Sequence, residues 1–187
     1  MSKTVVLMGS PRLQSNTDML ANSVIEGIRS AGSANDTIEK FDLVELQDCV
    51  CIACGHCRQA GECIHFPQVT EVLNKIKEAD GLVIATPTWW LAPSSQLKIF
   101  MDHWGTFLKM DYSSRIEGKK AVLVSCCGNP DLNFANKVNK QLEEILNLLG
   151  VKVVASLGVK GVVEVGAIAR DQESLDAARE LGKKLYR

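Results

Sequence analysis

The residues best suited to bind an anion lie between an apolar run at 5–8 and a helical pattern that begins near Thr17. Hydroxyl and amide donors are present at Ser10, Ser15, Asn16 and Thr17, and Arg12 adds a fork of charged donors. The first turn of the following helix contributes unpaired N–H groups and the positive end of its dipole. These features favour a phosphate-binding loop. The alternative is an ordinary turn in which Asn16 or Thr17 only caps the helix, and Arg12 argues against it because a cap has no need of a cation.

A second group of residues could hold a flat ring. Pro87, Thr88, Trp89 and Trp90 follow an apolar segment at 81–86, in a chain with only 5% aromatic residues. Two adjacent indoles are costly to expose unless they bind something. A dimer interface or a wedge in the core is the alternative role for either indole. A third loop contains Cys127 and Gly128, where glycine permits close approach of the backbone.

Four of the seven cysteines have metal-ligand spacing. Cys51, Cys54, Cys57 and Cys63 form the pattern C-x2-C-x2-C-x5-C. Such spacing lets thiolates gather around one centre, either a 4Fe-4S cluster or a tetrahedral zinc ion. The alternative is a covering loop with free thiols. His56 and His65 lie in or beside this segment, but a lone histidine there is more often a surface residue than a ligand.

The elements that must position these residues alternate along the chain. Apolar strand patterns occur at 4–8, 38–44, 81–86, 120–126 and 151–157, and amphipathic helical patterns at 17–31, 68–78, 93–108, 134–149 and 171–186. The strands are apolar on both faces, which is typical of a parallel sheet covered by helices on both sides. We therefore predict an α/β three-layer sandwich of the flavodoxin-like type, with a five-stranded parallel sheet of order 2-1-3-4-5.

In such a sheet the loops after strands one, three and four meet at the carboxyl edge. A phosphate site, a ring platform and a wall that meet there describe a site for a mononucleotide with a planar head. Flavin mononucleotide (FMN) fits this description best.

The composition of the chain indicates which classes of binding partner to expect. The chain has 187 residues, 46% of them hydrophobic, and a formal net charge of −1. We expect one domain over 1–187, with a cysteine-rich loop at 46–66. The absence of basic runs and of long apolar runs predicts no nucleic-acid partner and no membrane partner, and cytoplasmic location is the expectation.

The ordered motifs resemble the NAD(P)H-dependent FMN reductase family, near its iron-sulfur flavoprotein branch. The resemblance rests on Gly9-Ser10-Pro11-Arg12 with Ser15-Asn16-Thr17, on Ala79-Asp80-Gly81, on Thr86-Pro87-Thr88-Trp89-Trp90 and on Lys98-Ile99-Phe100-Met101-Asp102. It implies that Ser10, Arg12, Ser15, Asn16 and Thr17 hold the FMN phosphate, that 87–90 line the isoalloxazine, and that Cys127 and Gly128 border its other side. It also implies a homodimer or homotetramer.

The chain departs from the family pattern at three places. Trp89 stands where tyrosine is usual, His103 follows Asp102 where arginine is frequent, and Ile64-His65-Phe66-Pro67 follows the last cysteine where relatives of the iron-sulfur branch usually have paired aspartates. The first two put the shape of the substrate pocket in question, and the third puts the cluster in question.

Three functions follow from these residues. The leading hypothesis is an oxidoreductase in which NAD(P)H reduces FMN, which then reduces a small acceptor such as a quinone, a flavin, a nitro compound or a metal ion. The second is an iron-sulfur flavoprotein that exchanges electrons between ferredoxin and FMN through a 4Fe-4S cluster on Cys51, Cys54, Cys57 and Cys63. The third is a flavodoxin-like binding module whose cysteines hold zinc or sense redox state. No dedicated acid or base is expected, because the cofactor carries the chemistry.

Overall fold

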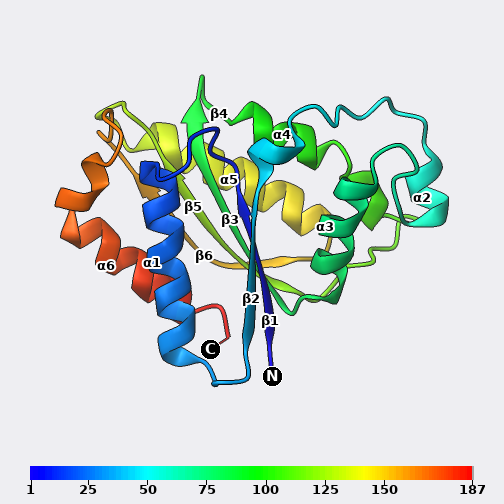
Figure 1. Ribbon diagram of the computed structural model, residues 1–187, viewed down its shortest axis with the longest axis horizontal. Helices are drawn as coiled ribbons and strands as arrows, with labels where there is room; N and C mark the ends of the chain where they lie inside the picture. Colours follow the sequence, from blue (N-terminus) through cyan, green and yellow to red (C-terminus); the bar gives the residue numbers. More distant parts are fainter. Residues whose placement is uncertain (187) are drawn as a thin grey trace.

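The computed structural model describes residues 1–186, so residue 187 of the predicted domain lies outside the described part (Figure 1). Five parallel strands form its sheet: β1 (Lys3–Met8), β2 (Thr37–Asp42), β3 (Gly81–Trp89), β5 (Lys120–Cys126) and β6 (Lys152–Val159). Their order is β2-β1-β3-β5-β6. This confirms the predicted flavodoxin-like order, since β4 (Ala92–Pro93) is a short addition that pairs antiparallel with the end of β3.

Helices cover both faces of the sheet because the strands are apolar on both. In β1, Val5 and Leu7 belong to one buried cluster, and Val6 and Met8 belong to the other. The first cluster is covered by α3 (Pro67–Glu78), α4 (Ser95–Met101) and α5 (Asn133–Leu148), and the second by α1 (Asn16–Ala31) and α6 (Gln172–Lys183). Figure 1 shows α1 and α6 packed side by side on one flank of the sheet.

Two glycines let α1 and α6 touch through their backbones. A Cβ at Gly27 would lie 1.9 Å from the carbonyl oxygen of Arg179, and one at Gly182 would lie 2.1 Å from that of Val24. Neither distance is possible for a real side chain. The helices that cover one face of the sheet therefore approach each other more closely than any other residue would allow at these two points.

The predicted helix at 93–108 is wrong in its second half. Ser94 caps α4 by accepting a hydrogen bond from the N–H of Leu97 at 3.2 Å, but the helix ends at Met101. A 3-10 turn, η2 (Trp104–Phe107), follows. Gly105 lies within this turn, and glycine weakens a helix interior. The break matters because the chain from Asp102 to Gly105 contributes to a cavity described below.

Smaller elements complete the chain. They are η1 (Leu43–Leu46), where the second strand was predicted to continue, α2 (His56–Ala60) inside the cysteine-rich loop, and η3 (Ala167–Arg170). Within residues 1–186, no helix combines the length and the apolar character needed to cross a bilayer.

Candidate functional site

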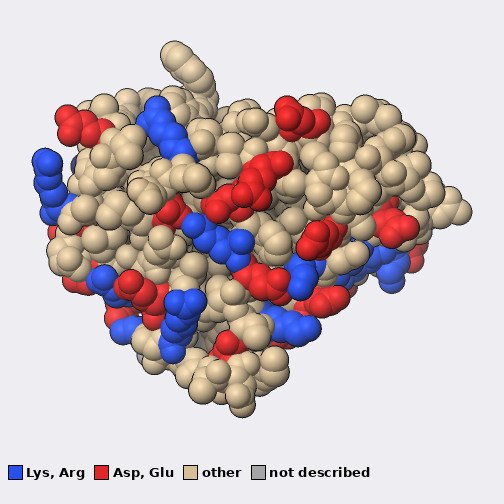
Figure 2. Space-filling model, in the orientation of Figure 1, with Lys and Arg blue, Asp and Glu red and all other residues tan. Residues whose placement is uncertain are grey.

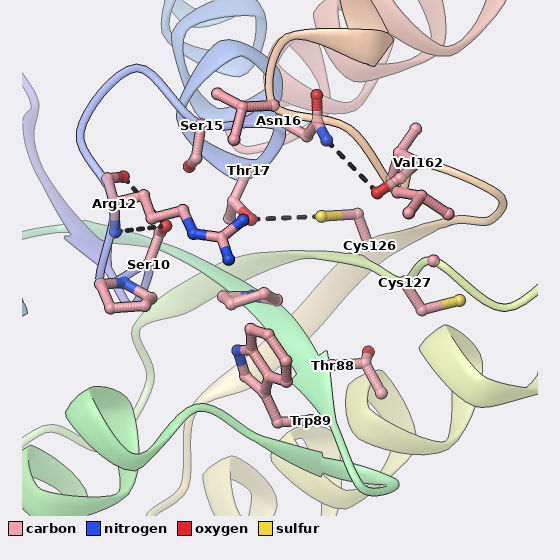
Figure 3. Close-up of a pocket in the computed structure, with 15 residues that line it drawn as sticks. Ser10, Arg12, Ser15, Asn16, Thr17, Thr88, Trp89, Cys126, Cys127 and Val162 are labelled. Atoms are coloured by element: carbon pink, nitrogen blue, oxygen red, sulfur yellow. Dashed lines mark hydrogen bonds between the residues drawn. The ribbon is translucent and has the colours of Figure 1, made fainter.

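A cavity of about 240 Å³ opens at the carboxyl edge of the sheet, where four loops meet (Figure 3). We call it the edge cavity. Its fifteen lining residues are Ser10, Pro11, Arg12, Ser15, Asn16, Thr17, Pro87, Thr88, Trp89, Cys126, Cys127, Gly128, Val162, Val163 and Val165. All residues predicted to bind the cofactor are among them except Trp90. The structure thus brings together the three loops that the sequence placed at one edge.

The first loop is curled by its own hydrogen bonds. The hydroxyl of Ser10 accepts from the N–H of Arg12 at 3.1 Å and donates to its carbonyl oxygen at 3.0 Å. Gln14 adopts a left-handed backbone conformation with φ of 54°. The Arg12 guanidinium extends across the cavity in Figure 3 and has no hydrogen-bond or ion-pair partner among residues 1–186. A charged donor without a partner beside a cavity is suited to bind an anion.

The loop ends at the N-terminus of α1. Ser15 is the cap, and its hydroxyl oxygen accepts from the N–H of Asp18 at 3.2 Å. The N–H groups of Asn16 and Thr17 lie in the first turn, where a helix has no acceptor of its own. They add to the positive potential at this end of the cavity.

Thr17 contacts a cysteine in the cavity wall. Its hydroxyl lies 3.2 Å from the Sγ of Cys126, and both residues are buried. Burial raises the pKa of the Cys126 thiol to about 11, against the smaller opposite effect of this hydrogen bond. The thiol is therefore neutral at physiological pH and acts as a hydrogen-bond partner.

The side chain of Asn16 is hydrogen-bonded within the protein. Its amide nitrogen donates to the carbonyl oxygens of Val162 at 3.3 Å and Glu164 at 2.7 Å, and its amide oxygen accepts from the N–H of Ile168 at 3.1 Å. Both N–H bonds of the amide are therefore already used. At this residue the backbone N–H of the first helical turn, rather than the side chain, is the donor left to face the cavity.

The other end of the cavity is formed by the end of β3. Pro87 and Trp89 supply flat apolar groups, and the hydroxyl of Thr88 is buried without a hydrogen-bond partner in the described chain. Arg12 lies at one end of the cavity and the flat apolar groups of Pro87 and Trp89 lie at the other, so the cavity has a charged end and an apolar end.

Trp90 departs from the prediction that it lines the ring site. It is 97% exposed and lies at the tip of the hairpin between β3 and β4. Trp90 and Leu91 have φ of 50° and 64°, the left-handed values required by a two-residue type I′ turn. The turn directs Trp89 to the cavity and Trp90 away from it, so that the two adjacent indoles do not share one role.

A fourth wall was not predicted. It consists of Val162, Val163 and Val165, which we call the valine wall, in the segment after β6. A Cβ at Gly128 would lie 3.3 Å from a methyl carbon of Val163, so the valine wall approaches the third loop closely. The signal was present in the sequence, because the segment after the fifth strand must reach the same edge as the loops after strands one, three and four.

The four cysteines with metal-ligand spacing surround a second cavity, of about 270 Å³. We call it the cysteine hollow. Cys51, Cys57 and Cys63 are half-buried, and Cys54 is exposed. Figure 1 places α2 of this loop at the opposite end of the molecule from α1. His56, His65 and His103 also line the hollow, whereas Cys49 is buried outside it with its Sγ accepting a hydrogen bond from Gln68.

Cations hold the cysteine-rich loop in place. Arg115 donates to the carbonyl oxygens of Arg58 and Gln59 at the end of α2, and also to those of Thr106 and Leu108. Arg58 stacks on the Tyr112 ring, with its guanidinium carbon 4.4 Å from the ring centre. Because α2 has no buried residue, these polar contacts fix the hollow.

The cysteine hollow has room between its thiols. Within the described chain, no three side chains of histidine, cysteine, aspartate or glutamate lie close enough together to hold one metal ion. A tetrahedral zinc site needs four ligands around a single point. In a 4Fe-4S cluster each cysteine binds a different iron, so its thiols stand apart around the cluster.

Several large apolar side chains are exposed on the loops that form the two cavities. Figure 2 shows the charged side chains gathered over the middle and lower part of the face in view, with few along the upper edge. Large exposed apolar residues of the loops at this edge are Leu13, Trp89, Trp90, Leu91, Val163 and Val165, and Val50, Ile52 and Ile64 lie in the cysteine-rich loop. An apolar rim suits uncharged or aromatic molecules approaching the edge cavity.

Comparisons with known proteins agree with this architecture. Residues 2–185 match Flavodoxin_2, a family described by its flavodoxin-like fold. An iron-sulfur flavoprotein of Methanocaldococcus jannaschii is 32% identical over 187 residues, which cover 98% of this chain and 95% of that protein. An FMN-dependent NADH:quinone oxidoreductase of Hydrogenovibrio crunogenus is 28% identical over 62% of this chain and 59% of its own length.

A solved structure shows the same fold. The NAD(P)H:quinone oxidoreductase from Methanothermobacter marburgensis has a TM-score of 0.79 with 22% identity, covering 100% of this chain and 98% of that one.

Proposed function

The chain belongs to the Flavodoxin_2 family, with its flavodoxin-like fold, and on this premise we propose that it is an FMN-dependent oxidoreductase that takes electrons from NAD(P)H. Family membership confirms the resemblance drawn from the motifs at 9–17 and 86–90. The observation that carries the proposal is the edge cavity, which has an unpartnered guanidinium at one end and flat apolar side chains at the other. The FMN-dependent quinone oxidoreductase among the relatives supports it.

When bound, FMN supplies the hydride and electron chemistry. The residues of this chain supply placement. Arg12 and the first turn of α1 would bind the phosphate. Pro87 and Trp89 would pack against the flat ring and exclude water from that end of the cavity.

The apolar rim indicates the class of acceptor. Trp89, Val163 and Val165 both line the cavity and are exposed, and among residues 1–186 Arg12 is the only charged residue in its lining. A small, flat, weakly charged acceptor such as a quinone or a nitro compound is therefore favoured over a hydrated metal ion. A homodimer or homotetramer remains a prediction.

The test is the affinity for FMN of the variant Arg12→Ala. Loss of charge-assisted hydrogen bonds to the phosphate is expected to weaken binding by about tenfold to a hundredfold. Arg29→Ala, at the exposed far end of α1, is the matched control and leaves the affinity unchanged. Flavin fluorescence titration measures both. Equal affinity of the Arg12 variant and the unsubstituted protein would contradict the phosphate assignment.

A second candidate is favoured by the cysteine hollow. We propose as the alternative that Cys51, Cys54, Cys57 and Cys63 bind a 4Fe-4S cluster, through which electrons from ferredoxin reach FMN. Two observations support it: the four thiols surround one cavity, and an iron-sulfur flavoprotein is a relative over almost the whole chain. Arg115 and Arg58 would hold the loop that carries these ligands.

The alternative is tested by iron and sulfide analysis of protein purified without oxygen. Cys57→Ser is expected to abolish the stable cluster, whereas Cys49→Ser, a buried cysteine outside the hollow, keeps it. Unsubstituted protein that contains zinc or no iron would reject the cluster.

A further inference from the structure

Asn16 connects two walls of the edge cavity that are far apart in the sequence. It is 8% exposed and occupies the first position of α1. Three hydrogen bonds join its side chain to the backbone of Val162, Glu164 and Ile168. The two ends of the amide therefore face one short segment of backbone, and the segment bends around it.

The middle of the segment that Asn16 holds is exposed. Val163 and Val165 are 72% and 60% exposed, and Glu164 between them is exposed as well. The two ends of the segment are anchored elsewhere: Val162 packs against the core and donates its N–H to the carbonyl oxygen of Cys127 at 3.1 Å, and the side chain of Ile168 is buried. With so little burial, backbone hydrogen bonds decide where this segment lies.

We infer that Asn16 is a positioning residue that holds the valine wall against the edge cavity, rather than a side-chain ligand of the phosphate. The inference rests on the proposed function, because it assigns the residue a role in flavin binding. Both N–H donors of the amide are already bonded, so a phosphate could gain them only if the valine wall were released. The valine wall then contributes to binding of the flavin body, independently of the phosphate.

Riboflavin distinguishes the two roles because it is the same flavin without the phosphate. The variants are Asn16→Ala and Asn16→Ser, of which the second keeps a small polar residue in the first turn should the first fail to fold. If Asn16 positions the valine wall, both variants bind FMN and riboflavin more weakly by the same factor, about tenfold or more for the loss of these hydrogen bonds. Arg12→Ala is the comparator, and it weakens FMN binding alone.

Hydrogen–deuterium exchange gives a readout that needs no flavin. In the flavin-free protein, the amides of 162–168 are expected to exchange faster in the Asn16 variants than in Arg12→Ala. Weaker FMN binding with unchanged riboflavin binding, or unchanged exchange at 162–168, would overturn the inference. Failure of the unsubstituted protein to bind either flavin rejects the proposed function instead, and the exchange measurement still decides whether Asn16 holds the segment.

Discussion

At the scale of single residues, the edge cavity combines groups that are free with groups that are already bonded. Arg12 and the hydroxyl of Thr88 have no partner in residues 1–186, whereas the amide of Asn16 and the hydroxyl of Ser10 are used within the protein. Residue type alone predicted all four as ligands. Which of them is free depends on the backbone that reaches the loop from elsewhere, and no local pattern contains that information.

The buried thiol of Cys126 is expected to make the stability of the protein depend on pH. Burial raises the pKa of its thiol from 9.0 to about 11. The unfolded chain therefore loses this proton at a lower pH than the folded protein, so the contribution to stability is complete below about pH 9 and is lost as the pH rises to about 11. The loss amounts to about 2 to 3 kcal/mol over this range.

Urea unfolding at a series of alkaline pH values measures the effect. Cys126→Ala is expected to flatten the decline in the free energy of unfolding. Ser95→Ala, which removes an exposed hydroxyl that does not titrate in this range, is the control and keeps the decline. Parallel pH profiles for the unsubstituted protein and Cys126→Ala would show that the Cys126 thiol is not responsible.

At the scale of elements, regular strands and helices were predictable and interruptions were not. Strands 81–86 and 120–126 are continuous apolar runs, and the structure has β3 and β5 there. The break after Met101 and the short strand β4 have no periodic pattern, because they are set by contacts with other parts of the chain. Topology alone brings the segment after β6 to this edge, but the valine wall's contact with the cavity depends on hydrogen bonds from Asn16, 148 residues away in the sequence, which no local pattern predicts.

The turn between β3 and β4 is strained. Left-handed conformations of residues other than glycine cost about 1 to 2 kcal/mol each, and Trp90 and Leu91 both adopt them. Asn-Gly is the usual sequence of such a turn. The double variant Trp90→Asn, Leu91→Gly is expected to raise the free energy of unfolding by about 1 kcal/mol.

Chemical denaturation of this variant checks the strain. Leu13→Gly is the matched control: this exposed leucine does not have a positive φ, so that glycine brings no relief and no gain in stability. A double variant no more stable than the unsubstituted protein would show that the turn is relaxed by other contacts.

At the scale of the whole molecule, contact between α1 and α6 fixes one face of the sheet. Gly27→Ala would place a methyl group 1.9 Å from the carbonyl oxygen of Arg179. We expect a loss of about 3 kcal/mol or more in the free energy of unfolding, even though alanine favours helix more than glycine does. Thermal and urea unfolding measure the loss.

The control for this variant is Asn22→Ala on the exposed side of the same helix, where stability should change by no more than about 0.5 kcal/mol. A Gly27→Ala protein as stable as the control would mean that α6 can move away from α1 at no cost. In that case the face of the sheet beneath both helices would not depend on close packing.

The contact between these helices also has a consequence for biosynthesis. The backbone that Gly27 packs against, at Arg179, is made 152 residues after Gly27 itself. At a synthesis rate of about 5 to 20 residues per second, α6 is made about ten to thirty seconds after α1. Leu20, Val24 and Ile28, all buried in the folded protein, lack the cover of α6 during that interval. Chaperones that bind apolar segments can bind the nascent chain at these residues.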